Sequence, residues 1–578
     1  MSDDKLVVPP KQRFAPWLLE PMRRNRAIYM KVVLAAVVIN IFALVTSLFT
    51  MVVYDMVLPN NATSSLIALT IGLAIVIIFD FALKTLRAYF VDVAGARIDR
   101  EVGESVFAKL IALRLDQKRG STGALAAVVR ELETLRDFFA SATLTAIVDV
   151  PFIVITLIVI AIIGGPLVFV PLVMIPLVIV AAAIAQPALD RLSSAAMGQG
   201  LLKQAVLVET IGGLETVKTS GAAPIVTQRW LDAIEDHSNI SLRQRLVGNI
   251  SVTIAGSAQM ISYAGVVVVG VGRIASQDLT MGGLIACSIL AGRAVAPLGQ
   301  IATLLSRVTA TRTAYRQLDG LMESPPEGPS GEPLSPAQTK GRIEFRNVHF
   351  RYPGAAEKAL EGVSFVIEPG EHVALLGRVG SGKSTIARLI LGLYEQEEGL
   401  ILLDGTDIRQ FDPIDLRRRV GSAMQESLLL SGSVRENIIL GREGIDDEEM
   451  LRATEVSGTH QFMGQIPNGY DLRLADRGEG LSGGQRQSIA IARALAGRPQ
   501  VLLFDEPSSA MDQQTENGLL VRLEQELKGK TFLVITHRTP FLKLVSRVII
   551  LDRGKIVADG PRDKVLAQIS RPKVAAAS

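Results

Sequence analysis

The chain has 578 residues, of which 49% are hydrophobic and 20% charged, and its mean hydropathy is +0.34. This mixture favours a membrane-spanning part joined to a soluble domain over one uniform globule. A net charge of +3 is too small for this length to indicate a nucleic-acid partner, and a single cysteine, Cys287, excludes an intrachain disulfide.

The N-terminal segment, residues 1–26, ends in a basic cluster: Arg23, Arg24 and Arg26. The apolar stretch at 32–53 is too long for a signal peptide and lacks a clear small-residue cleavage site. As a helix it would extend about 33 Å, enough to cross the hydrocarbon core of a membrane. We therefore expect a retained transmembrane helix.

Six apolar runs of this kind occur, at residues 30–54, 63–84, 138–163, 167–187, 248–272 and 280–303. Short links join the runs in pairs, and two long polar segments, about 85–137 and 188–247, separate the pairs. The long segments are rich in Lys and Arg, which predicts that they and both termini are cytoplasmic. Their helical periodicity favours extensions of the membrane helices within a transmembrane domain, 27–322; two small separate subdomains are the alternative.

The composition changes after this region. Pro, Gly and Ser are frequent at 325–338, which predicts an interdomain linker over 323–340. Beyond it, apolar strands expected at 343–345, 373–376, 501–504 and 532–535 alternate with helical stretches. This alternation favours an α/β domain with a largely parallel core sheet over 341–570, followed by a tail, 571–578.

A phosphate-binding loop follows the strand expected at 373–376. Residues 377–384 have the sequence G-R-V-G-S-G-K-S, which matches G-x-x-x-x-G-K-[ST] between a strand and a helix. Lys383 is expected to reach the β- and γ-phosphates of ATP, and the Ser384 hydroxyl to bind Mg²⁺. The nucleotide contacts expected from the loop come from Gly377, Gly380, Ser381, Gly382, Lys383, Ser384 and Thr385.

An acidic pair closes the strand expected at 501–504. The carboxylate of Asp505 would face the Mg²⁺, directly or through water, and Glu506 can polarise the attacking water as a general base. The alternative is a strand-end acidic pair that caps a helix.

Between these motifs, residues 481–485 have the sequence L-S-G-G-Q, before a helix expected at 488–495. This pentapeptide is the signature of the ATP-binding cassette family, which the chain resembles. The resemblance implies a head-to-tail homodimer, in which the signature of one cassette closes on the γ-phosphate of the other through Ser482, Gly483, Gly484 and Gln485. A flexible loop is the alternative for an isolated S-G-G sequence.

Other positions match the family pattern across 343–565. The resemblance implies that Tyr352 stacks on adenine, that Gln425 senses Mg²⁺ and that His537 contacts the γ-phosphate. It also implies that residues 509–512, which end in Asp512, form the D-loop. Taken singly, Tyr352 could be a strand aromatic and His537 a strand-end cap. Because Glu506 and the signature both match the family pattern, the resemblance implies that a homodimer has two ATP sites competent for hydrolysis.

Several segments resemble type I secretion ATPases, the exporters of haemolysin type: Y-D-M-V-L-P at 54–59, D-V-P-F at 149–152, G-R-A-V-A-P-L at 292–298, D-R-G-E-G at 476–480 and T-H-R-T at 536–539. The resemblance implies a six-helix exporter that spans the bacterial inner membrane and contacts its lipids. It would move an unfolded repeats-in-toxin or adhesin-like polypeptide, with a periplasmic adaptor and an outer-membrane channel. A lipid or drug exporter is one alternative, and an ATP-gated channel or regulator is another.

Many members of that branch carry a folded peptidase-type domain before the first membrane helix. Here about 26 residues precede it, too few for a core, and the sole cysteine lies in the last apolar run. We therefore expect no cleavage of double-glycine leader peptides.

Three charged residues, Asp80, Asp149 and Arg293, lie in apolar runs, where a charge is unfavourable unless it is paired or lines a wet cavity. We predict that Arg293 faces the dimer interior and shares an aqueous or ion-paired region with Asp149 along the translocation path. A structural ion pair, or a position near the membrane boundary, is the alternative.

Overall fold

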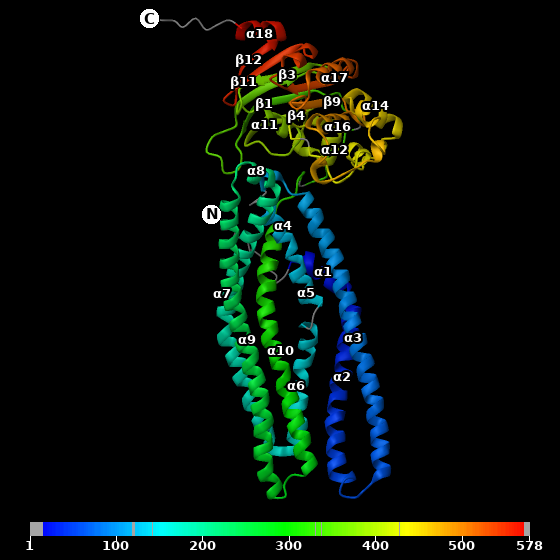
Figure 1. Cartoon of the computed structure of the whole chain (residues 1–578), viewed down its shortest axis with the longest axis vertical. Coiled ribbons are helices and arrows are strands. Elements are labelled where there is room, and N and C mark those ends of the chain that lie inside the picture. Colours follow the sequence, from blue (N-terminus) through cyan, green and yellow to red (C-terminus); the bar gives the residue numbers. More distant parts are fainter. Residues whose placement is uncertain are drawn as a thin grey trace, which may run out of the picture. The chain divides into compact units, whose positions relative to one another are not determined.

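The computed structural model describes residues 15–117, 122–140, 143–329, 331–336, 338–426 and 428–570. Some side chains inside these ranges, including that of Asp149, lie outside the described part. The chain forms two compact units (Figure 1): a helical unit, Met1–Ala112 with Arg119–Ser324, and a cassette unit, Leu113–Lys118 with Pro325–Ser578.

The helical unit consists of long helices joined by short turns. Its elements are α1 (Pro16–Arg24), α2 (Arg26–Val52), the π-helical turn η1 (Val53–Val57), α3 (Thr63–Ile111), α4 (Thr122–Arg130), α5 (Leu132–Ala140), α6 (Thr143–Gly164), η3 (Gly165–Val168), α7 (Phe169–Gly212), α8 (Leu214–Thr219), α9 (Ala223–Ala275) and α10 (Met281–Met322). The helices α3, α7, α9 and α10 have 49, 44, 53 and 42 residues. A membrane crossing needs only about 20, so α3, α7 and α9 continue well beyond one crossing into the polar segments.

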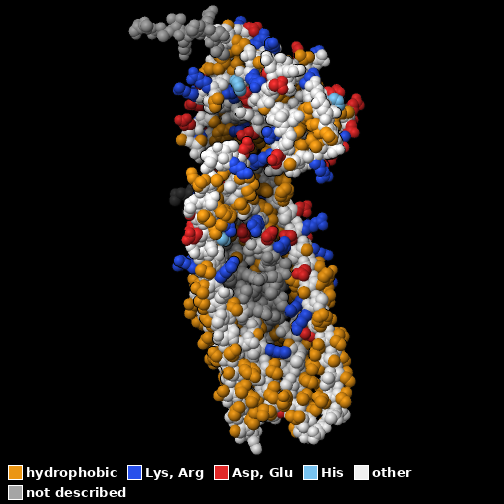
Figure 2. All heavy atoms as spheres, viewed as in Figure 1, with side chains coloured by type: hydrophobic (Ala, Val, Ile, Leu, Met, Phe, Trp, Pro, Cys, Tyr) orange, Lys and Arg blue, Asp and Glu red, His pale blue; other side chains and the backbone are white. Residues whose placement is uncertain are grey.

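Among the described residues, five helical stretches are long and apolar enough to cross a membrane: Arg26–Val57, Thr63–Ile111, Val150–Gly212, Ala223–Ala275 and Met281–Gly299. The third contains most of α6 and all of α7, with a turn between them at Gly165, whose φ of +56° suits glycine. Within the described residues, each of the six predicted apolar runs is mostly helical. On the face shown in Figure 2, apolar side chains cover the lower part of the helical unit. Cys287 is fully buried.

The cassette unit contains the predicted parallel sheet. Its strands, in spatial order, are β12 (Lys555–Pro561), β11 (Arg547–Asp552), β3 (His372–Gly377), β10 (Thr531–Ile535), β9 (Val501–Asp505) and β6 (Val420–Ala423). All neighbours from β11 to β6 are parallel, and β12 is antiparallel. Every residue of β9 and β10 is buried, which explains their unbroken apolar sequences.

Two smaller sheets complete the cassette unit. One has the order β2 (Leu360–Ile367), β1 (Ile343–Phe350), β4 (Glu398–Leu403) and β5 (Thr406–Asp407), and the other pairs β7 (Gly432–Ser433) with β8 (Arg473–Leu474). The helices are α11 (Lys383–Ile390), α12 (Pro413–Arg419), α13 (Val434–Ile439), α14 (Asp447–Ser457), α15 (Thr459–Met463), α16 (Gly483–Leu495), α17 (Gln513–Glu526) and α18 (Arg562–Ser570), with 3-10 turns at Leu115–Gln117, Ile408–Gln410, Gly469–Asp471, Asp476–Gly478 and Thr539–Leu544.

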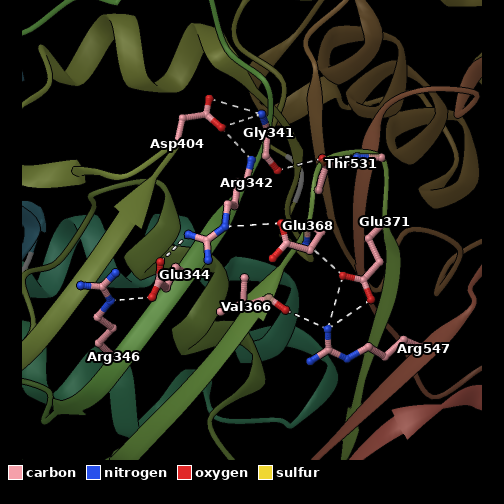
Figure 3. Close-up of polar contacts among 11 residues, drawn as sticks. Gly341, Arg342, Glu344, Arg346, Val366, Glu368, Glu371, Asp404, Thr531 and Arg547 are labelled. Atoms are coloured by element: carbon pink, nitrogen blue, oxygen red, sulfur yellow. Dashed lines mark hydrogen bonds and ion pairs between the residues drawn. The ribbon is translucent and has the colours of Figure 1, made fainter.

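The segment predicted as a linker is bound along the cassette. The Asp404 carboxylate accepts hydrogen bonds from the backbone amides of Lys340, Gly341 and Arg342 at 2.8, 3.0 and 2.8 Å, the latter two visible in Figure 3. Farther upstream, Arg417 pairs with Glu327 at 2.8 Å. The short segment Leu113–Lys118 is also part of this unit, where Arg114 pairs with Glu395 at 2.9 Å.

Candidate nucleotide-binding site

The loop between β3 and α11 is folded tightly enough to require glycine. A Cβ atom at Gly377 would lie 2.2 Å from the carbonyl oxygen of Leu551, and one at Gly382 would lie 2.6 Å from that of Ala359. Gly382, with a φ of +101°, stands directly before α11. Ser381 and Thr385 are buried, whereas Gly380 borders open space. The loop is therefore a cradle at the N-terminus of a helix, where anions are favoured.

Lys383 is turned back onto this loop. Its Nζ donates to the carbonyl oxygens of Gly377 at 2.9 Å and of Arg378 at 2.8 Å. Burial lowers the pKa of Lys383, while the nearby carboxylates Glu506 and Asp505 oppose that shift.

Asp505 is the last residue of β9, which lies between β10 and β6, and Glu506 follows it. Burial raises the pKa of Asp505, and a hydrogen bond with Ser384 opposes this shift. Within the described part of the chain, Asp505 Oδ1 and Glu506 Oε2 are buried without a hydrogen-bond partner. Leaving buried polar atoms unsatisfied is unfavourable by about 1–3 kcal/mol each, so these two oxygens fit a site that receives a cation, water or phosphate.

Glu506 has an unusual backbone and a fixed side chain. Its φ is +50°, and its amide donates to the carbonyl of Ile535 at 2.8 Å. Its Oε1 lies 2.7 Å from Nδ1 of His537, whose side chain is 73% exposed. The structure thus brings together the loop 377–385, the acidic pair and the histidine that the sequence indicated separately.

Tyr352 lies beside α11. Its hydroxyl is 3.1 Å from Oγ1 of Thr385 and accepts a hydrogen bond from Arg388 at 2.9 Å, while its ring meets that of Tyr394 edge-on. Sequence reasoning missed Arg388 and Tyr394. The available signal was their place, Arg388 one turn into α11 after the phosphate-binding loop and Tyr394 shortly after the end of α11.

The signature residues form the N-terminus of α16. Ser482 Oγ accepts from the Gln485 amide at 3.2 Å, and Gln485 Oε1 accepts from the Ser482 amide at 2.8 Å, which is a capping box. A Cβ atom at Gly483 or Gly484 would lie 3.1 Å from an atom of Ala510, so the signature packs against the D-loop.

Two residues predicted to bind nucleotide make none of the hydrogen bonds described above. Asp512 is exposed and caps α17 by accepting from the Thr515 amide at 2.8 Å, which lowers the pKa of Asp512. Gln425 is exposed in the loop after β6.

The helical unit contains a separate open pocket of about 550 Å³ between α9 and α10, whose lining is mixed polar and apolar. Gln259, Tyr263 and Arg293 contribute to its lining, and Arg293 also donates to the carbonyl of Ala43 on α2. Asp80 pairs with Lys84 at 2.7 Å, within α3. The predicted proximity of Asp149 to Arg293 concerns a side chain outside the described residues.

Comparisons with known proteins match both units. The family described as "ABC transporter transmembrane region" matches residues 29–298, and the family "ABC transporter" matches residues 360–509. The toxin RTX-I translocation ATP-binding protein of Actinobacillus pleuropneumoniae is 34% identical over 552 residues, covering 95% of this chain and 78% of that protein. The leukotoxin translocation ATP-binding protein LktB of Mannheimia haemolytica is also 34% identical, over 554 residues and with the same coverage.

A solved structure has the same fold. The structure of a bacterial Atm1-family ABC exporter with ATP bound superimposes with a TM-score of 0.84 and 24% identity, over 95% of this chain and 97% of that one.

Proposed function

This chain belongs to the ABC exporters of the type I secretion branch, and from that premise we propose that it moves an unfolded polypeptide across the bacterial inner membrane. It is a multi-pass membrane protein that binds nucleotide and couples ATP hydrolysis to transport. The observation that carries the proposal is the similarity to toxin translocation proteins across both units, not the cassette alone.

The proposed arrangement is a homodimer with both termini and both cassettes in the cytoplasm, supported by the basic long segments. A periplasmic membrane-fusion adaptor and an outer-membrane channel would continue the path to the outside. The exported substrate is of the repeats-in-toxin or adhesin type.

The proposed ATP site uses the residues gathered at the carboxyl edge of the parallel sheet. Tyr352 stacks on adenine, and the loop from Gly377 to Thr385 holds the phosphates, with Lys383 on the γ-phosphate. Glu506 accepts a proton from the attacking water, while His537 holds the carboxylate and contacts the γ-phosphate.

Mg²⁺ fits beside this loop. Ser384, Asp505 and Gln425 would hold the ion, and the unpartnered Oδ1 of Asp505 supports this assignment. When bound, Mg²⁺ neutralises charge on the β- and γ-phosphates.

The second half of each site comes from the other cassette. The partner's Ser482, Gly483, Gly484 and Gln485 would close on the γ-phosphate, and the partner's Asp512 lies in the adjoining D-loop. The exposed Ser482 at the start of α16 supports this, since a helix N-terminus favours an anion.

Reconstituted vesicles test the substrate. The full chain is assayed for ATPase stimulation and for ATP-dependent uptake of a fluorescent polypeptide that is unfolded without Ca²⁺. We expect the unfolded polypeptide to stimulate the ATPase and to be taken up into a protease-protected space. Neither effect is expected with a stably folded version of the polypeptide, nor with the Glu506→Gln exporter. Stimulation by lipid or by small apolar drugs, with no polypeptide uptake, would instead indicate the lipid or drug exporter.

A further inference from the structure

Gln487 is the fifth residue of α16 and is 5% exposed. Both ends of its side-chain amide are engaged. Nε2 donates to the carbonyl oxygen of Glu506 at 2.7 Å and to Ser509 Oγ at 3.1 Å, and Oε1 accepts from the Ala510 amide at 3.1 Å. One buried amide therefore joins the signature helix to the residue after β9 and to the D-loop.

The contact with Glu506 fixes a backbone that would not hold its shape unaided. A φ of +50° is unfavourable for a residue with a Cβ atom. On one side the Glu506 amide is bonded to Ile535, and on the other the Glu506 carbonyl is bonded to Gln487. The direction of the carboxylate toward His537 depends on this backbone.

The D-loop is held from its other side as well. Arg538 donates to the carbonyl of Ser509 at 3.2 Å and to Glu516 at 3.3 Å. With the loop held between Arg538 and Gln487, a movement of α16 displaces the loop and the Glu506 carbonyl together.

We propose that Gln487 is a positioning residue that links the two ATP sites of the dimer. The inference rests on the proposed head-to-tail arrangement, in which the N-terminus of α16 serves the partner's nucleotide while Glu506 serves its own. Closure of the signature on the partner's γ-phosphate moves α16, and the Gln487 amide transmits that movement to Glu506. Hydrolysis in one site thereby depends on closure of the other.

Gln487→Met tests the link because it preserves length and packing but has no amide. We expect turnover at saturating ATP to fall about 10- to 100-fold, as small misplacements of catalytic groups do. Nucleotide affinity and the thermal midpoint of the full chain should stay unchanged, and cooperativity in ATP should be lost. Gln487→Glu, which loses both donated bonds, should behave similarly, whereas Gln525→Met, at an exposed glutamine of α17, should match the wild type.

A double-mutant cycle separates this inference from the proposed function. If Gln487 acts through Glu506, then Gln487→Met causes no further loss in a Glu506→Gln background. If the two substitutions instead reduce turnover independently, so that their fold-losses multiply in the double variant, the inference is overturned. Unchanged turnover in Gln487→Met would also overturn it, and so would a parallel loss of turnover, nucleotide affinity and thermal midpoint. Wild-type turnover of Glu506→Gln alone would instead remove the catalytic base from the proposed function.

Discussion

His537 Nδ1 lies 2.7 Å from Oε1 of Glu506, while Oε2 of the same carboxylate is buried without a hydrogen-bond partner in the described part of the chain. One oxygen is thus held and the other is free to accept. A carboxylate fixed in this way is suited to take a proton from one water molecule in a defined position.

The first prediction concerns this base. Glu506→Gln keeps the side-chain shape and the contact with His537 but removes the proton acceptor. Turnover should fall about 10²- to 10⁴-fold, with nucleotide binding retained and the dimer trapped closed. Steady-state hydrolysis measures the loss of turnover and equilibrium binding measures the retained nucleotide affinity, with Glu524→Gln, at an exposed glutamate of α17, as control. Turnover close to wild type would exclude Glu506 as the base.

The second prediction concerns the stability of the cassette. Glu344 on β1 lies between two arginines (Figure 3), and hydrogen bonds from Arg346 and Arg342 lower the pKa of Glu344 to about 2. Because the usual value is about 4.3, the ionised carboxylate stabilises the folded state above that pH. The stabilisation is lost as the pH falls through the folded value.

Glu344→Gln should therefore lower the thermal midpoint of the full chain at pH 7. The expected decrease is about 1–3 °C, since both arginines are partly exposed and such pairs are weak. The difference from wild type should shrink between about pH 4.3 and pH 2. Glu357→Gln, at an exposed glutamate, should show no such pH dependence. A difference that persists at pH 2 would contradict the assignment to ionised Glu344.

The elements of the cassette could be predicted because their signals are local. The loop 377–384 and the acidic pair each follow an apolar strand, and the parallel register of β3, β10 and β9 brings these strand ends to one edge. The left-handed backbone of Glu506 and its bonds to His537 and Gln487 could not be predicted. They join residues 31 and 19 positions apart, and no local pattern specifies which side chains meet.

Amino-acid composition also does not predict which contacts hold a segment against a domain. The frequent Pro, Gly and Ser at 325–338 predict a linker, but they do not indicate that Asp404 binds the three amides from Lys340 to Arg342. The same holds for the membrane half, where hydropathy predicts six helices but not the pocket shared by α9 and α10.

The third prediction concerns that pocket. Arg293 lies on its wall with Gln259 and Tyr263, and polar side chains within a membrane helix commonly line a transport path. Arg293→Ala should lower polypeptide uptake about tenfold, equivalent to about 1.4 kcal/mol in the barrier, and leave nucleotide affinity unchanged.

Vesicle uptake and nucleotide binding are measured in parallel for Arg293→Ala. Arg273→Ala, at an arginine near the end of α9 that pairs with Asp278, serves as the control. Unchanged uptake in Arg293→Ala, or a dimer structure in which Arg293 faces lipid, would contradict a role in the path.

Cross-linking between subunits tests the composite ATP site most directly. Val379 is fully exposed in the phosphate-binding loop, and Ser482 is exposed at the start of α16. In a background of Cys287→Ala and Glu506→Gln, one tagged subunit carries Val379→Cys and the other carries Ser482→Cys. A short thiol cross-linker should join the two different subunits when ATP and Mg²⁺ are present, and far less without them. Absence of this ATP-dependent product from a correctly assembled dimer would contradict head-to-tail sites.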